Sequence, residues 1–330
     1  MAELLEDGKL IIKLKYMTTQ QIYELGIKLG IKSDLRGEVK VKKYLDRASV
    51  RYEKASKEEK GEFDKEKLVN PYSDSRVLNT NGAKEIKKIM IGIDMEGPEL
   101  MLANQMGDID LVIAHHPEGP ALADLHSVMD LQSEVLAQYG VPINIAESVI
   151  KPRISEVGRG VSPANHNRAV DIARALKMNF MCLHTPCDNL GASFLDKLLK
   201  KKKPEFVSDI LKMLKEIPEF KEATKLKAGP VLFAGDPENS CGKVAISEFT
   251  GGTSGSKDIY EKMAQAGIGT VIGMHMGEEH RKEAEKYHIN VVIAGHMASD
   301  SLGINLFLDD LEKKGIEVVP MSGLIRIKRK

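Results

Sequence analysis

The histidines of this chain gather where predicted strands end. All nine lie between His115 and His296, and none lies in the first 114 residues. Four apolar segments typical of strands run into ligand-type side chains, which are His115-His116, His184 with Asp188, His275, and His296 with Asp300. Histidine is the commonest metal ligand and acid/base side chain. Ligands of open α/β sheets bind outside the carboxyl ends of the strands, so these residues are the candidates for chemistry.

Each of these motifs alone has a structural explanation, but together they predict a metal site. Adjacent side chains of a strand point to opposite faces, so His115 and His116 serve two ions only if the strand breaks at Pro117. A carboxylate such as Asp188 has two oxygens and can bridge two cations. His296 and Asp300 are spaced to share one face of a helix. A mixed nitrogen and oxygen shell suits two divalent ions of Zn, Mn, Fe or Ni.

The remaining histidines are assigned by their surroundings. His184 is our first choice for a catalytic proton-transfer group or a residue that supports a ligand; the alternative is a buried ring that donates one hydrogen bond. His275 and His280 could line the same cleft, but the charged segment around them favours a surface cluster at the start of a helix. The others are predicted to be structural or exposed, and they are His126, His166 and His288.

The elements that position these residues form a pattern that occurs twice. From Lys88, short apolar strands alternate with helical segments, which is the signature of βαβ units. The first copy is predicted as strand 88–94, helix 99–106, strand 110–116, helix 123–139, strand 141–146, helix 166–178 and strand 179–184. The second is predicted as strand 243–249, helix 258–266, strand 269–275, helix 278–287, strand 290–294, helix 302–314 and strand 316–320. The fold class is therefore α/β, with two similar three-layer lobes of duplicated βαβ units.

The domain boundaries follow from changes in composition. Residues 1–85 are predicted to be a helical N-terminal extension, in which Thr18-Thr19 cap a helix with apolar residues at helical spacing. Residues 86–195 form the first α/β lobe, and 229–330 form the second, with the metal site between them. The stretch 196–228 is a helical, charged insert. Its lysine run, Lys200–Lys203, is interpreted as a solvated helix end rather than a phosphate-binding patch.

Composition excludes several classes of function. The chain has 330 residues and 36.4 kDa, with 48 Lys plus Arg against 48 Asp plus Glu and a pI of about 7.1. A neutral balance predicts neither a nucleic-acid partner nor an anionic membrane partner. Three cysteines are too few for a disulfide framework and indicate a reducing compartment. The first residues are charged, and no apolar run approaches the roughly 18 residues of a membrane span, so we expect a cytoplasmic protein.

Several of these motifs resemble one known family. The segments are IDLVIAHHP, HTPCDN, the Gly-Gly turn of EFTGGTSG, and VIAGHMASDSLGINLFLDDLEKKGIEVVPM. They are similar to the Nif-three-like family of dinuclear-metal proteins, often called GTP cyclohydrolase 1 type 2 homologues. The resemblance covers about Lys88 to Lys328. It implies two similar α/β lobes, a two-metal site between them, and toroidal hexamers.

The resemblance also implies a ligand set. By position, the metal ligands are His115 and His116, the bridging Asp188, and the late pair His296 and Asp300. Two positions depart from the family: the late acid is usually Glu, one methylene longer than Asp300, and the usual Gly-Asp of the second lobe reads Gly273-Met274 here. The N-terminal segment does not match the family's opening, so nothing is carried over to residues 1–85.

Two functions are compatible with this site. The first is a metal-dependent hydrolase of a small molecule, such as a nucleotide or a pterin-like ring, because paired cations acidify a bridging water and stabilise an oxyanion. The alternative is a non-catalytic metal-binding or metal-handling scaffold, which needs neither an open coordination position nor proton-transfer groups. A third hypothesis, a nucleic-acid partner, rests only on short basic tracts.

Overall fold

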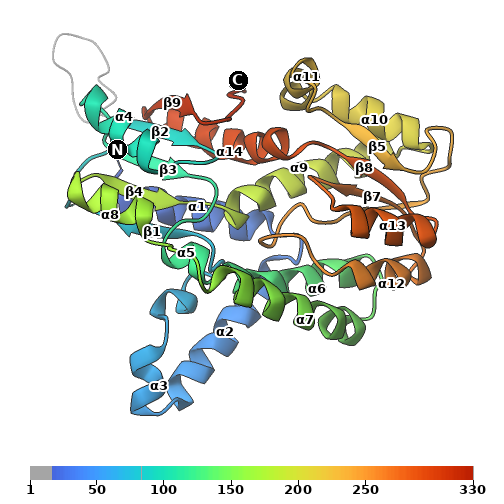
Figure 1. Cartoon of the computed structure of the whole chain (residues 1–330), viewed down its shortest axis with the longest axis horizontal. Coiled ribbons are helices and arrows are strands. Elements are labelled where there is room, and N and C mark those ends of the chain that lie inside the picture. The colour runs from blue at the N-terminus through green and yellow to red at the C-terminus, as the bar shows by residue number, and fades with distance from the viewer. Residues whose placement is uncertain (1–16, 83, 330) are drawn as a thin grey trace, which may run out of the picture.

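The described residues form two sheets, and four strands of the first sheet follow the same order as the four strands of the second. The computed structural model describes residues 17–82 and 84–329. The first sheet has the order β1-β4-β3-β2-β9 and the second β5-β8-β7-β6 (Figure 1). Strand β1 is antiparallel to β4, and β5 is antiparallel to β8. The other pairings are parallel. The strands are β1 (Arg76–Asn79), β2 (Lys88–Gly92), β3 (Leu111–Ala114), β4 (Asn179–Cys182), β5 (Val231–Ala234), β6 (Lys243–Ile246), β7 (Ile268–Gly273), β8 (Asn290–Ile293) and β9 (Glu317–Met321).

The shared order β1-β4-β3-β2 and β5-β8-β7-β6 confirms the predicted two-lobe α/β fold. The helices of the first half are α4 (Gly97–Met106), α5 (Pro120–Ala123), α6 (Asp130–Gln138), α7 (Ile143–Val161), α8 (Arg168–Ala175) and α9 (Thr185–Lys202), with the 3-10 turn η2 (Leu125–Met129). Those that follow are α10 (Val207–Lys215), α11 (Pro218–Lys225), α12 (Tyr260–Gln265), α13 (Glu278–Lys286) and α14 (His296–Glu312), with η3 (Lys257–Ile259). Within the described residues, no helix is both long enough and apolar enough to cross a membrane.

Helices α9 and α14 join the two lobes. Each begins directly after the equivalent strand, β4 or β8, and the two pack against one another between the sheets (Figure 1). They cross at two glycines. A Cβ on Gly303 would lie 2.2 Å from the carbonyl oxygen of Cys187, whereas a Cβ on Gly191 would lie 3.6 Å from its nearest neighbours. Glycine at position 303 therefore allows the backbones to approach closely.

The N-terminal segment is part of the first lobe. It contains α1 (Thr19–Ser33), α2 (Glu38–Lys54), α3 (Lys57–Glu62) and the 3-10 turn η1 (Lys65–Leu68), of which α2 and α3 project from the body of the molecule (Figure 1). Thr18 and Gln21 form a capping box at the start of α1, and this helix packs along α9. The predicted domain boundary at residue 85 would place β1 outside the first lobe. In the structure, β1 pairs with β4 and so belongs to the first sheet. Residues 1–16 of the extension lie outside the described residues.

Three predicted elements differ from the structure. The predicted strand 141–146 is instead the start of α7, because Pro142 occupies the N-cap and its buried residues recur at helical spacing. The predicted helix 123–139 is divided into α5, η2 and α6. The last strand, β9, falls within the predicted second lobe but pairs with β2, so α14 carries the chain back to the first sheet.

Candidate metal centre

Four histidines and two aspartates meet at the carboxyl ends of β3, β4 and β8. His115 and His116 follow β3, and His184 follows β4 as the N-cap of α9. Asp188 lies in the first turn of α9, while His296 and Asp300 lie in the first turns of α14. The strand ends and the paired helices thus bring together residues that are far apart in the sequence.

The facing atoms of this cluster are separated by distances typical of ligands on one cation. His115 Nε2 lies 3.3 Å from Asp188 Oδ1 and 3.6 Å from Asp300 Oδ1. The other oxygen of Asp300, Oδ2, lies 3.6 Å from His116 Nε2 and 3.5 Å from His296 Nε2. Metal–ligand bonds of about 2.1 Å in tetrahedral geometry place two ligand atoms roughly 3.4 Å apart. Asp300 therefore faces two groups of ligands, one with each oxygen.

The potential ligand atoms fall into three groups whose members lie within 4.8 Å of one another. They are His115 with Asp188 and Asp300, His116 with His296 and Asp300, and His115 with His116 and His184. Asp300 is the carboxylate that belongs to two groups, whereas the family resemblance gives the bridging role to Asp188. Asp188 Oδ2 instead faces His184 Nε2, at 3.8 Å.

Hydrogen bonds to Nδ1 leave Nε2 of three imidazoles available as a ligand. Nδ1 of His115 donates to the carbonyl oxygen of Leu183 at 3.0 Å. Nδ1 of His116 donates to Asp94 Oδ1 at 2.6 Å, and Nδ1 of His184 to Asp74 Oδ2 at 2.9 Å. Carbonyl and carboxylate partners on one nitrogen are the usual support of a metal-binding histidine, since they direct the lone pair of the other nitrogen to the ion.

Three atoms of the cluster are buried without a hydrogen-bond partner. They are His115 Nε2, Asp188 Oδ1 and Asp300 Oδ2, on residues that are 1%, 4% and 1% exposed. Leaving a buried polar atom unsatisfied costs about 1–3 kcal/mol, and more for a charged group. Metal cations held by the groups that contain these atoms would satisfy all three, so the residues present fit a metal-binding site.

The electrostatics of the cluster also favour cations. Burial opposes the charge of His115, but the carboxylates of Asp300 and Asp188 raise its pKa well above the usual value. Burial likewise opposes the charge of Asp300, yet His115 and His116 lower its pKa. Burial lowers the pKa of His296. Because a ligand must be deprotonated, binding of a metal at His115 would release the proton that the neighbouring carboxylates favour on this ring.

The structure places His275 and His280 in different surroundings. The His275 ring lies 4.7 Å from the His296 ring and its Nδ1 is 3.4 Å from Ser254 Oγ, so His275 lies beside the metal centre and not in the favoured surface cluster. His280 instead bonds through Nε2 to the carbonyl oxygen of Gly255, at 3.0 Å. The residue-type pattern alone did not distinguish them, because both follow β7.

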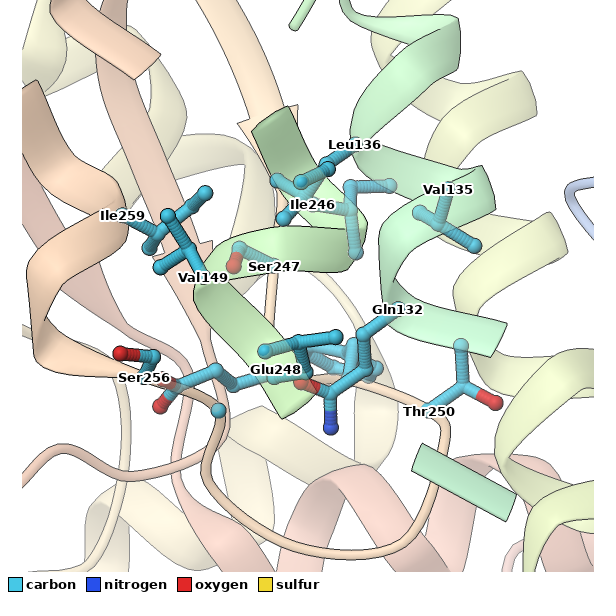
Figure 2. A pocket seen from close by; sticks show the side chains of 14 residues that line it. Gln132, Val135, Leu136, Val149, Ile246, Ser247, Glu248, Thr250, Ser256 and Ile259 are labelled. Carbon is cyan, nitrogen blue, oxygen red and sulfur yellow. The ribbon is translucent and has the colours of Figure 1, made fainter. Parts of the chain in front are cut away.

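A small cavity lies between α6, α7 and the loop that follows β6 (Figure 2). Its volume is about 20 Å³, enough for roughly one water molecule. Glu248 lines it, has a buried Oε2 without a hydrogen-bond partner, and has its pKa raised by burial. The cavity is too small for a nucleotide or a pterin ring.

Two signals for the site were missed in the sequence. The segments HTPCDNLG at 184–191 and HMASDSLG at 296–303 share the pattern His-x-x-x-Asp-x-Leu-Gly, which marks the equivalent starts of α9 and α14. Asp94, which accepts a hydrogen bond from His116, lies two residues after the end of β2 and so fits the rule that ligands bind at the carboxyl ends of strands. Asp74 lies in a loop before β1, and no sequence pattern connects it to the site.

The fold and site together define a class: a two-lobed α/β protein with clustered imidazoles and carboxylates where its lobes meet. The chain is similar to a NIF3 superfamily protein from Sphaerobacter thermophilus, with 31% identity and a TM-score of 0.71. The alignment covers 76% of this chain and 92% of the other. The chain therefore belongs to the NIF3 superfamily.

Two further solved structures are less similar to this chain. Reduced HcgD from Methanocaldococcus jannaschii is 17% identical with a TM-score of 0.46, covering 74% of this chain and 87% of that protein. The protein ybgI, described as of unknown function, is 16% identical with a TM-score of 0.44, covering 76% and 90%. No family model and no curated protein matches the sequence.

The partly buried carboxyl of Glu118, two residues after His116, predicts a pH dependence of stability. Burial, followed by the charge of Glu96, raises the pKa of Glu118 from 4.5 to about 7. Folding therefore favours its protonated form, and this contribution to stability is lost as the pH rises from 4.5 to about 7. We expect metal-free Glu118→Gln and wild type to have equal free energies of unfolding near pH 4. At about pH 8 the variant should be about 1 kcal/mol more stable, allowing for solvent screening.

Urea unfolding of both metal-free proteins across this pH range measures the difference. A difference between variant and wild type that stays constant from about pH 4 to 8 would contradict the assignment to Glu118.

Proposed function

We propose that this protein is a dinuclear metal-dependent hydrolase of a small molecule, such as a nucleotide or a pterin-like ring, similar to GTP cyclohydrolase 1 type 2. The observation that carries the proposal is the position of Asp300, whose two oxygens face His115 on one side and His116 with His296 on the other. Divalent ions held by these residues would supply the means to acidify a water and to stabilise a forming oxyanion.

The candidate metal centre has a closed side, which is buried, and an open side, which is exposed to solvent. The side chains of His115 and Asp188 are 0% and 4% exposed, so the ligands on this side are sealed from solvent. Those of His116 and His296 are 27% and 37% exposed. A substrate would therefore approach over His116 and His296. This supports an enzyme over a storage site, which needs no open side.

Proton transfer is assigned by position. His275 borders the open side, and burial lowers its pKa, which leaves the ring neutral and able to accept a proton near neutral pH. His184 lies on the closed side, with its side chain 9% exposed. The sequence-based candidate for proton transfer, His184, therefore lies farther from the expected substrate than His275, and we assign proton transfer to His275. We also propose that the protein acts in the cytoplasm as a homohexamer.

Activity of the reconstituted protein tests the proposal. Metal-free protein is loaded with Zn²⁺, Mn²⁺, Fe²⁺ or Ni²⁺ and assayed with nucleoside triphosphates, pterins and cyclic amidines. We expect turnover that depends on metal, falls at least about 100-fold in His275→Ala, and is unchanged in His288→Ala, which changes a histidine remote from the site. Full metal occupancy without turnover on any substrate would overturn the hydrolase and favour the metal-handling scaffold.

A further inference from the structure

A buried carboxylate outside the ligand groups is hydrogen-bonded to one of the imidazoles. Asp74 is 0% exposed and lies in the loop between η1 and β1. Its Oδ2 accepts hydrogen bonds from His184 Nδ1 at 2.9 Å and from Thr185 Oγ1 at 2.6 Å. Ser75 Oγ donates to Asp74 Oδ1 at 3.3 Å and accepts the backbone N–H of His184 at 2.9 Å. Both the ring and the backbone of His184 are thus held by this loop.

The loop is in turn fixed by the N-terminal helices. Asn70 Nδ2 donates to the carbonyl oxygens of Tyr72 and Ser75 and to the hydroxyl of Tyr23, at 2.8, 3.0 and 2.8 Å. Tyr23 lies on α1 and is buried. The Tyr72 hydroxyl, also buried, donates to Asp34 Oδ2 at 2.9 Å. These contacts leave the loop little freedom to move away from His184.

The contact with Asp74 determines which nitrogen of His184 is free. An ionised carboxylate only accepts hydrogen bonds, so the short contact requires a proton on Nδ1. In the neutral ring the lone pair is then on Nε2, which lies 3.8 Å from Asp188 Oδ2. His184 also belongs to one ligand group with His115 and His116.

We propose that Asp74 is a positioning residue that holds His184 as a metal ligand through Nε2, and that the N-terminal segment thereby forms part of the metal centre. The inference rests on the metal-binding part of the proposed function and not on hydrolysis. It gives residues 19–75 a role that the sequence did not indicate. It also places His184 among the ligands of the closed side, in preference to a proton-transfer role.

The tautomer of His184 in the metal-free wild type is the first test, and it needs no variant. Nitrogen-15 NMR of labelled histidine distinguishes a protonated Nδ1 from a protonated Nε2, and His184→Ala identifies the signal. We expect His184 to carry its neutral-state proton on Nδ1. A proton on Nε2 would overturn the proposal.

Calorimetric titration of metal-free Asp74→Asn with Zn²⁺ is the second test. Loss of a carboxylate partner of a ligand histidine costs about 10–100-fold in metal affinity, so we expect one of the two ions to bind that much more weakly. Asp110→Asn is the matched control. Asp110 accepts the backbone N–H groups of Lys87 and Lys88 at the opposite end of the same sheet, so this variant should bind both ions as wild type does.

A double-variant cycle separates positioning from a general loss of stability. If Asp74 acts through His184, the Zn²⁺ affinity of Asp74→Asn/His184→Ala should equal that of His184→Ala alone. Two outcomes would overturn the proposal. In one, the losses of Zn²⁺ affinity of the two single variants multiply in the double variant; in the other, Asp74→Asn binds Zn²⁺ as tightly as wild type does. If Asp74→Asn does not fold, Ser75→Ala takes its place in the cycle with the same criteria. Absence of hydrolysis would refute the proposed activity without affecting these readouts.

Discussion

Replacing Asp300 with asparagine is expected to weaken the binding of both cations, whereas Asp188→Asn should weaken the binding of only one. Asp300 faces His115 through Oδ1 and both His116 and His296 through Oδ2, so it belongs to two ligand groups. Asp188 belongs to one of these groups. Asparagine keeps the shape of the side chain but removes its negative charge. We expect affinity for each ion to fall at least about 100-fold in Asp300→Asn, more than loss of a supporting residue costs.

Calorimetry and metal content after dialysis measure this difference. Asp310→Asn is the control, because Asp310 lies on the same helix but is partly exposed and pairs with Lys313. It should retain two ions per chain. Equal losses in the Asp300 and Asp188 variants would contradict the assignment of Asp300 as the shared carboxylate, and retention of two ions in Asp300→Asn would exclude it from the site.

Replacing Gly303 with alanine is expected to lower the free energy of unfolding by about 3 kcal/mol or more. The new Cβ would lie 2.2 Å from the carbonyl oxygen of Cys187, a backbone atom that no rotamer change can move. Relief requires α9 and α14 to separate, and this would displace Asp188 and Asp300 at the same crossing. Chemical unfolding measures the loss, and calorimetry should show weaker metal binding in the same variant.

Gly191→Ala is the matched control on the partner helix. Its Cβ would lie 3.6 Å from the nearest atoms, an ordinary van der Waals contact. Alanine also favours a helix over glycine by up to about 1 kcal/mol, so this variant should be as stable as wild type or slightly more stable. Similar losses at both positions would show that the crossing does not depend on close approach at Gly303.

The sequence predicted the parts of this protein that depend on local pattern. Apolar strands followed directly by ligand-type residues indicated which side chains lie at the sheet edges, and the structure brings together His115, His116, Asp188, His296 and Asp300. The duplication was visible because each lobe repeats the same order of strands and helices. Metal binding by these five residues and the catalytic role of His184 both stay predictions.

Features that depend on long-range pairing could not be predicted. The residue pattern of β9 indicates a strand but not the sheet to which it belongs. Helix α14 carries the chain from the second sheet back to the first, where β9 pairs with β2. The segment 141–146 is apolar enough for a strand, and only its packing at helical spacing makes it the start of α7. Asp74 contacts a residue 110 positions away, and its neighbours in the sequence carry no metal-site pattern. Such supporting residues become visible only when the chain is folded.

Anomalous diffraction from crystals of the Zn²⁺-loaded protein would show whether this cluster holds two cations. We expect two peaks per chain, roughly 3.5–4 Å apart. One should lie among His115, Asp188 and Asp300, and the other among His116, His296 and Asp300. Zinc absent from this cluster, or bound only at other positions, would contradict it.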